Sequence, residues 1–242
     1  MWHVLMDLSE SLEEHWTLVG GQMAFLHALE HGITPVRLTE DGDVIADIRS
    51  NQDALSHVIS GLTNAGLVLE GISSFEIGHR YVREVTNATP TPMGHTERVV
   101  VDVLAPEGVG ERANLSTTGP ARTVEAPGGT QALHRSRLVQ VTHGKRVGHV
   151  PCPSLLGALV AKCAALRLPG NAERHLLDVA LLFALIEDPF LLQAELTRSD
   201  QARLRHATDL DDERHEAWRL LPANLASRGQ YARYIMTSTS QS

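Results

Sequence analysis

Apolar positions along the chain alternate between helical spacing and short continuous runs, which predicts a mixture of helices and strands. Residues 16–19 form a short apolar run that leads through Gly20-Gly21 into a helical pattern over 23–31, and Gly32 ends that pattern. The same criteria predict further helices over 5–15, 51–65, 155–166 and 173–186, and strands over 41–48, 67–70, 75–82, 98–104 and 138–142. We interpret 105–120 as a loop and 124–150 as a β-rich stretch with turns at Gly128-Gly129 and Gly144.

The two kinds of pattern are separated along the chain. Pro151-Cys152-Pro153 is interpreted as a breakpoint, because strands dominate before it and helices after it. We therefore predict a core over 1–150, a helical C-terminal part over 151–235 and a disordered tail over 236–242.

One predicted strand carries an unusual number of acids. Asp41, Asp43 and Asp47 stand at even spacings, so their side chains are expected on one face, with the first two Cα atoms about 6.5–7 Å apart. Two carboxylates about 5 Å apart repel by roughly 3 kcal/mol at an effective dielectric constant near 20. A cation is expected to offset that repulsion, and Mg²⁺ bound to a nucleotide phosphate is the natural candidate.

A further acid lies in the most apolar strand, where Asp102 stands between Val101 and Val103. An acid at such a position is costly to bury unless it is paired or binds a metal. Asp102 is either a satisfied core or turn acid, or the third carboxylate of a metal site with Asp41 and Asp43.

Two other features suggest a phosphate site. The strand, Gly20-Gly21 and helix succession lets a ligand approach the backbone at a helix N-terminus, although a tight turn explains the same pattern. Lys145 and Lys162 are the two lysines of the chain, and Ser154 is a natural N-cap for the helix that carries Lys162. Lys162 lies beside an apolar stripe, so it either extends to solvent or points into a site, where it would neutralise phosphate.

The composition limits the classes of function. The net charge of −8 excludes a basic surface over the whole molecule, although a local patch could still hold RNA. Cys152 and Cys163 are too few for a disulfide framework, and Cys163 is expected in the core. No signal peptide or apolar run long enough to span a membrane is visible, so we expect a cytoplasmic protein without a membrane partner. The 13 histidines form no metal-binding pattern.

Taken as a set, these residues resemble a known family. Gly20-Gly21 before a helix, followed by Arg37-x-Thr39-x-Asp41-x-Asp43, is similar to the nucleotidyltransferases of the AbiEii type. That family provides the toxins of type IV toxin–antitoxin systems, and the MenT toxins are relatives. Asp102, Lys162 and Asp178 follow in the expected order, and the resemblance covers about residues 15–185.

The resemblance implies the α+β fold of the DNA-polymerase-β-like nucleotidyltransferases, a mixed sheet flanked by helices and followed by a helical C-terminal part. It implies transfer of NMP from an NTP, with two Mg²⁺ held by Asp41, Asp43 and Asp102 and with Asp102 acting on the attacking hydroxyl. Gly20, Gly21, Arg37, Thr39, Lys162 and Asp178 would bind the substrate. The implied partners are an NTP, an RNA acceptor such as tRNA, and an antitoxin protein.

The sequence departs from the family pattern at two positions. Gly42 replaces an apolar residue, so the strand is expected to be locally irregular, and Asp47 is an extra acid without an assigned role. Two other functions stay open at this stage. One is an adenylyltransferase that acts on a small hydroxylated molecule, as aminoglycoside-modifying enzymes do. The other is a non-catalytic nucleotide-binding or interaction module of the same fold.

Overall fold

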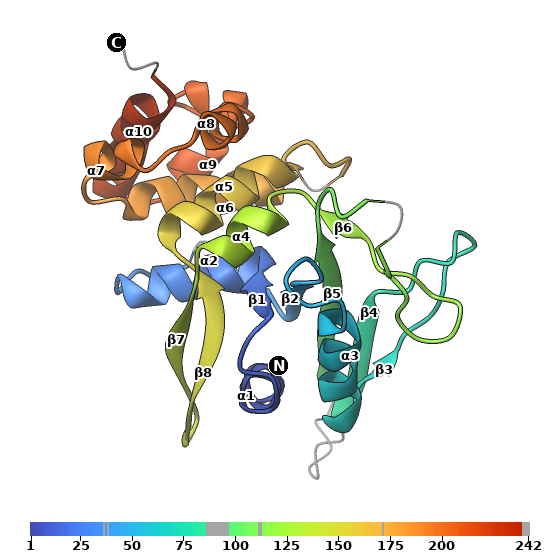
Figure 1. Ribbon diagram of the computed structural model, residues 1–242. Coiled ribbons are helices and arrows are strands. Elements are labelled where there is room, and N and C mark those ends of the chain that lie inside the picture. Colours follow the sequence, from blue (N-terminus) through green and yellow to red (C-terminus); the bar gives the residue numbers. More distant parts are fainter. Residues whose placement is uncertain (36, 38, 86–96, 111–112, 171, 239–242) are drawn as a thin grey trace.

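A mixed β-sheet forms the centre of the protein, as the computed structural model shows for residues 1–35, 37, 39–85, 97–110, 113–170 and 172–238 (Figure 1). The strands lie in the order β1 (Trp16–Val19), β2 (Asp41–Ala46), β5 (Glu97–Pro106), β4 (Arg80–Val85) and β3 (Val68–Leu69), and β6 (Glu125–Ala126) pairs with the end of β5. β2 and β6 run parallel to β5, whereas the other pairs are antiparallel. This arrangement confirms the predicted mixed α+β sheet.

Helices cover both faces of this sheet. On one face α1 (Trp2–Ser11) packs against α3 (Ala54–Asn64), and α3 packs on β2 and β5. On the other face α2 (Gly20–Glu30) packs on β2, and α4 (Gly129–His134) and α5 (Leu155–Ala165) complete the layer. The hairpin of β7 (Ser136–His143) and β8 (Arg146–Pro153) projects from the end opposite the C-terminal helices (Figure 1).

The C-terminal part is helical, as the sequence predicts. It contains α6 (Ala172–Leu185), α7 (Pro189–Ala194), α8 (Arg198–Leu204), the 3₁₀ turn Thr208–Asp211, α9 (Glu216–Arg219) and α10 (Ala223–Thr237). The apolar helix α6 lies at its centre, between α5 and α10. Trp218 of α9 is buried and donates its indole N–H to the Leu210 carbonyl at 3.1 Å. The division at residue 150 itself remains a prediction.

Several predicted elements differ from the observed ones. Residues 75–79 precede β4 instead of belonging to it, and the predicted turn at Gly128-Gly129 is the beginning of helix α4. The predicted breakpoint Pro151-Cys152-Pro153 is the end of strand β8, and helix α5 follows with Ser154 as its N-cap, as expected. Helix α10 continues to Thr237, into the predicted tail, and 239–242 lie outside the described residues.

Strand β2 is regular at the position where irregularity was expected. Gly42 pairs with Val101 in an uninterrupted ladder, and a Cβ there would come within 3.3 Å of the Met1 sulfur. The glycine therefore makes room for the Met1 side chain, just before α1, without bending the strand. Cys163 lies in the core, as predicted, and burial raises the pKa of its thiol well above the usual range. Among the helices that the structure describes, none is long and apolar enough to cross a membrane.

Candidate functional site

The strand register brings three of the predicted site residues into neighbouring positions. Asp43 of β2 pairs with Asp102 of β5 in the parallel ladder, and Asp41 precedes Asp43 by two residues on the same face. Asp102 is buried, as the sequence predicts, whereas the side chain of Asp41 is 44% exposed. The acids of two distant sequence segments therefore lie side by side.

Gly20 is required by the position of Asp43. Val19, the last residue of β1, pairs with Asp43, and helix α2 begins at the next residue. Gly20 has a positive φ of 69°, and a Cβ on it would lie 1.7 Å from the Asp43 carboxylate oxygen Oδ2. A side chain at this position would therefore displace the carboxylate, and the glycine serves both the turn and the close approach.

Asp43 lies in an electrostatically unfavourable environment. Burial is the main cause that raises its pKa to about 7, and the neighbouring carboxylates of Asp102 and Asp41 add to this shift. Lys162 and Arg80 lower the pKa only in part. A carboxyl group in this state gains from an additional cation, because a positive charge stabilises its ionised form.

Arg80 is the cation that stabilises Asp102. It stands opposite Asp102 in the β4–β5 ladder, its Nε donates to Oδ1 at 2.8 Å, and its Nη2 donates to Oδ2 at 2.8 Å. The same Nη2 lies 3.7 Å from Oδ2 of Asp41. These hydrogen bonds and the charges of Asp102 and Asp41 raise the pKa of Arg80 above its ordinary value, so it remains charged.

A second ionic cluster links the sheet layer to the C-terminal helices. Lys162 of α5 donates to Oδ2 of Asp178 at 2.7 Å, and both side chains are 4% exposed. Arg37 donates to the same carboxylate through Nε at 3.1 Å and Nη2 at 3.0 Å. Two cations thus share one carboxylate, which leaves a net positive charge for an anionic ligand. Lys162 does not extend to solvent.

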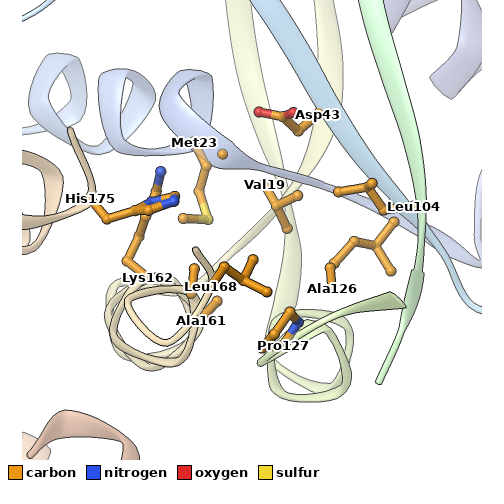
Figure 2. Close-up of a pocket in the computed structure, with 13 residues that line it drawn as sticks. Val19, Met23, Asp43, Leu104, Ala126, Pro127, Ala161, Lys162, Leu168 and His175 are labelled. Atoms are coloured by element: carbon orange, nitrogen blue, oxygen red, sulfur yellow. The ribbon is translucent and has the colours of Figure 1, made fainter. Parts of the chain in front are cut away.

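The two clusters meet at a cavity of about 150 Å³. Figure 2 shows Asp43 on one side and Lys162 with His175 on another, with the apolar side chains of Val19, Leu104 and Leu168 nearby. Burial and the charge of Lys162 lower the pKa of His175 to about 4, so its imidazole is neutral near pH 7. Its buried Nδ1 makes no hydrogen bond to the residues that the structure describes. The cavity combines an acid, a cation and a neutral polar ring with an apolar wall.

Gly21 and Thr39 contribute to the same region. A Cβ on Gly21 would lie 2.7 Å from both Nη2 of Arg37 and Cγ2 of Thr39, so this glycine also makes room for neighbouring side chains. The side chain of Gln22 donates to the Thr39 carbonyl, which ties the segment before β2 to helix α2. The Gly20-Gly21 pair and the Arg-x-Thr-x-Asp-x-Asp segment are separated along the chain. In the structure they therefore contact each other and form one local unit.

The acids suit a single divalent ion better than the predicted three-carboxylate set. Asp41 and Asp43 supply carboxylate oxygens, and Mg²⁺ commonly binds proteins through one or two such groups and several waters. Both oxygens of Asp102 accept hydrogen bonds from Arg80. Within the described part of the chain, no group of three or more His, Cys, Asp or Glu side chains is arranged to hold a metal ion. Asp41 and Asp43 are therefore the two acids of this cluster that would hold one Mg²⁺.

Two residues of this site were not predicted from the sequence. Arg80 falls in a predicted strand, but its partner depends on a strand register that the local sequence does not determine. His175 lies near the start of α6, and its spacing of three from Asp178 places both on one helix face. That spacing is the signal that could have revealed His175. Asp47 lies one residue beyond β2 and accepts a hydrogen bond from the Ser50 N–H at 3.2 Å.

Comparison with known proteins supports the fold. No protein-family model matches the sequence, and no curated protein matches it. Among solved structures, an antigenic nucleotidyltransferase-like protein from Paracoccidioides brasiliensis is similar, with a TM-score of 0.51 and 16% sequence identity over 94% of this chain and 89% of that one. The chain has a nucleotidyltransferase-like fold. At this identity the similarity concerns the fold alone.

Proposed function

We propose that the protein is a Mg²⁺-dependent nucleotidyltransferase that transfers NMP from an NTP to a hydroxyl acceptor. The observation that carries this proposal is the position of Asp43, beside Gly20 at the N-terminus of α2 and across a cavity from Lys162, in a nucleotidyltransferase-like fold. Asp41 lies two residues before Asp43 on the same face of β2. An ion bound by the two carboxylates would neutralise charge on the triphosphate and favour displacement of pyrophosphate.

The residues around the acids have roles that follow from their contacts. Lys162 and Arg37 would offset the charge of the phosphates, and Asp178 holds both of them in position. The backbone N–H groups at the start of α2, at Gly20 and Gly21, would favour an anion as well. The apolar wall of the cavity would accept the flat face of a nucleobase, with His175 as its polar neighbour.

The acceptor and the biological role belong to the same proposal. The resemblance to AbiEii-type toxins favours RNA, such as tRNA, or a protein as acceptor, an antitoxin as partner and the cytoplasm as location. Arg80 and Arg37 give local positive charge near the acids, although the whole chain carries a net charge of −8. A gene for a small winged-helix antitoxin next to this one would support the toxin role.

Incubation with each of the four NTPs, labelled at the α-phosphate, tests this function. We expect Mg²⁺-dependent transfer of label to one class of acceptor when total RNA, protein and a panel of hydroxylated small molecules are offered separately. Label in the RNA or protein fraction supports a toxin-like enzyme, and label in a small molecule supports the adenylyltransferase alternative. Absence of transfer and of pyrophosphate release with every NTP and acceptor would contradict the proposal.

One observation favours a second candidate, a non-catalytic nucleotide-binding module. The Asp102 carboxylate, which the family resemblance assigns to the attacking hydroxyl, is held by two hydrogen bonds from Arg80. Calorimetric titration distinguishes the two functions. NTP binding that needs no Mg²⁺ and leads to no turnover supports the module, whereas Mg²⁺-dependent binding with release of pyrophosphate supports the enzyme.

A further inference from the structure

Three charged residues form a row across three neighbouring strands. Asp43 of β2 pairs with Asp102 of β5, and Asp102 pairs with Arg80 of β4. Residues that pair directly across a sheet point to the same face, so the row reads acid, acid, arginine. Asp41, two residues before Asp43, lies within 3.7 Å of the guanidinium. The sheet itself therefore supplies a cation to its acidic cluster.

The guanidinium of Arg80 engages both oxygens of Asp102. Its two N–H groups reach the two carboxylate oxygens at 2.8 Å each, which is the planar, bidentate geometry of a strong arginine–carboxylate pair. The Asp102 side chain is 10% exposed and the Arg80 side chain is 43% exposed, so the carboxylate is largely shielded from solvent while the guanidinium stays partly accessible. A divalent ion bound to these oxygens would stand next to a fixed positive charge, and repulsion would oppose it.

The net charge of the cluster of Asp41, Asp43, Asp102 and Arg80 favours one bound divalent ion. When all three carboxylates are ionised, they and the one guanidinium carry two net negative charges, which one divalent ion neutralises. We propose that Arg80 takes the place of a second divalent ion, so that the acidic site binds one divalent cation, through Asp41 and Asp43, while the guanidinium holds Asp102. This inference rests on the proposed function only in taking the acids as a cation site. Arg80 is a positioning residue for Asp102.

The number of bound ions tests the inference without reference to activity. The full chain is titrated with Mn²⁺, and the EPR signal of the free ion is monitored. This measurement gives the number of divalent sites per chain. We expect one bound Mn²⁺ per wild-type chain. The Arg80→Ala variant frees the oxygens of Asp102, and we expect it to bind two. Arg98→Gln is the matched control, because Arg98 is a half-exposed arginine of β5 that pairs with Glu70, and we expect it to bind one.

Thermal melting gives a second readout. Without divalent ions Arg80→Ala should melt at a lower temperature than the wild type, because three carboxylates then lack their internal cation. Saturating Mn²⁺ should raise the melting temperature of Arg80→Ala by more than that of the wild type or of Arg98→Gln. An Arg80→Lys variant keeps a charge but loses the bidentate geometry. The rise of its melting temperature with Mn²⁺ should lie between those of the wild type and Arg80→Ala.

The outcomes separate this inference from the proposed function. Two Mn²⁺ ions on the wild type, or none, would overturn it, even if the Arg80→Ala protein did not fold. An unchanged count of one in folded Arg80→Ala would overturn it as well. One Mn²⁺ on the wild type and two on Arg80→Ala would support the inference, even if no NMP transfer were ever detected. NMP transfer by a wild type that binds two ions would support the proposed function and overturn the inference.

Discussion

At the scale of single residues, close approach explains the glycines of this site better than flexibility does. Gly20 combines a positive φ with a carboxylate in the space where its Cβ would stand. Gly32, at the other end of α2, has a similar φ of 66°, but a Cβ there would have no described atom within 4 Å. A substitution at Gly32 therefore measures the cost of backbone strain alone. The same substitution at Gly20 measures that cost together with the cost of displacing Asp43.

We predict that Gly20→Ala is much more harmful than Gly32→Ala. Alanine at a positive φ costs on the order of 1 kcal/mol, which is the loss expected for Gly32→Ala. Gly20→Ala adds the collision with Asp43, and we expect a further loss of at least about 1 kcal/mol. Urea unfolding of both variants measures the two free energies. Equal losses would show that Asp43 does not lie against Gly20.

His175 gives a prediction about pH. Its pKa is lowered to about 4 in the folded protein, mainly by burial, while in the unfolded chain it returns to the ordinary histidine range near 6.5. Between these values the unfolded chain binds the additional proton, so the folded state loses stability as pH falls from 6.5 towards 4.

The test compares the pH dependence of two variants. Between pH 6.5 and pH 4, the free energy of unfolding should fall by about 1 kcal/mol less in His175→Gln than in the wild type. This figure allows for partial solvent screening of the imidazole. His57→Gln, on the exposed side of α3, is the control and should follow the wild type. Urea unfolding at several pH values measures this. If His175→Gln loses as much stability as the wild type, the burial of His175 is not as described.

At the scale of secondary-structure elements, Asp178 joins three segments. Its carboxylate on α6 binds Lys162 of α5 and Arg37 of the segment before β2. Breaking a buried ion pair by removing one partner typically costs about 3–5 kcal/mol, because the remaining charge is left unpaired. We expect Asp178→Asn to lose about that much stability in urea unfolding, since two cations depend on it.

The control for Asp178 lies on the same helix. Glu173 is an exposed acid in the first turn of α6, and Glu173→Gln should cost less than about 1 kcal/mol. A similar loss in both variants would mean that helix electrostatics, rather than the contacts of Asp178, stabilises this region.

The sequence was informative about elements and less so about their pairing. The acidic strand, the apolar strand with Asp102 and the helices α5 and α6 follow from local patterns, because burial of one face fixes hydrophobic periodicity. The pairing of Arg80 with Asp102 depends on which strands meet and in which register, and both are settled by tertiary packing. Pro151-Cys152-Pro153 form the end of strand β8, a position where proline is tolerated, and only helices follow among the described residues; a domain boundary there stays a prediction.

At the scale of the whole molecule, the cavity needs both parts of the chain. Asp43 and Gly20 come from the sheet layer, while Lys162 and His175 come from the helical part after residue 151. Helix α10 packs on α6, and Arg228 of α10 donates to the Ala184 carbonyl at 2.5 Å. The C-terminal helices therefore support one wall of the candidate site, and residues on both sides of the predicted division at residue 150 line the cavity.

The central claim is that Asp43 binds a divalent ion and acts on a nucleotide, and that it is not needed for stability of the fold. The most direct measurement compares NMP transfer by Asp43→Asn and Asp47→Asn, using α-labelled NTP and the acceptor fraction that the wild type labels. Asparagine has the shape of aspartate and removes the repulsion with Asp102, so Asp43→Asn should stay folded in urea unfolding. We predict that it loses about 100-fold or more of the transfer rate, while Asp47→Asn keeps the wild-type rate. Transfer at the wild-type rate by folded Asp43→Asn would contradict the account.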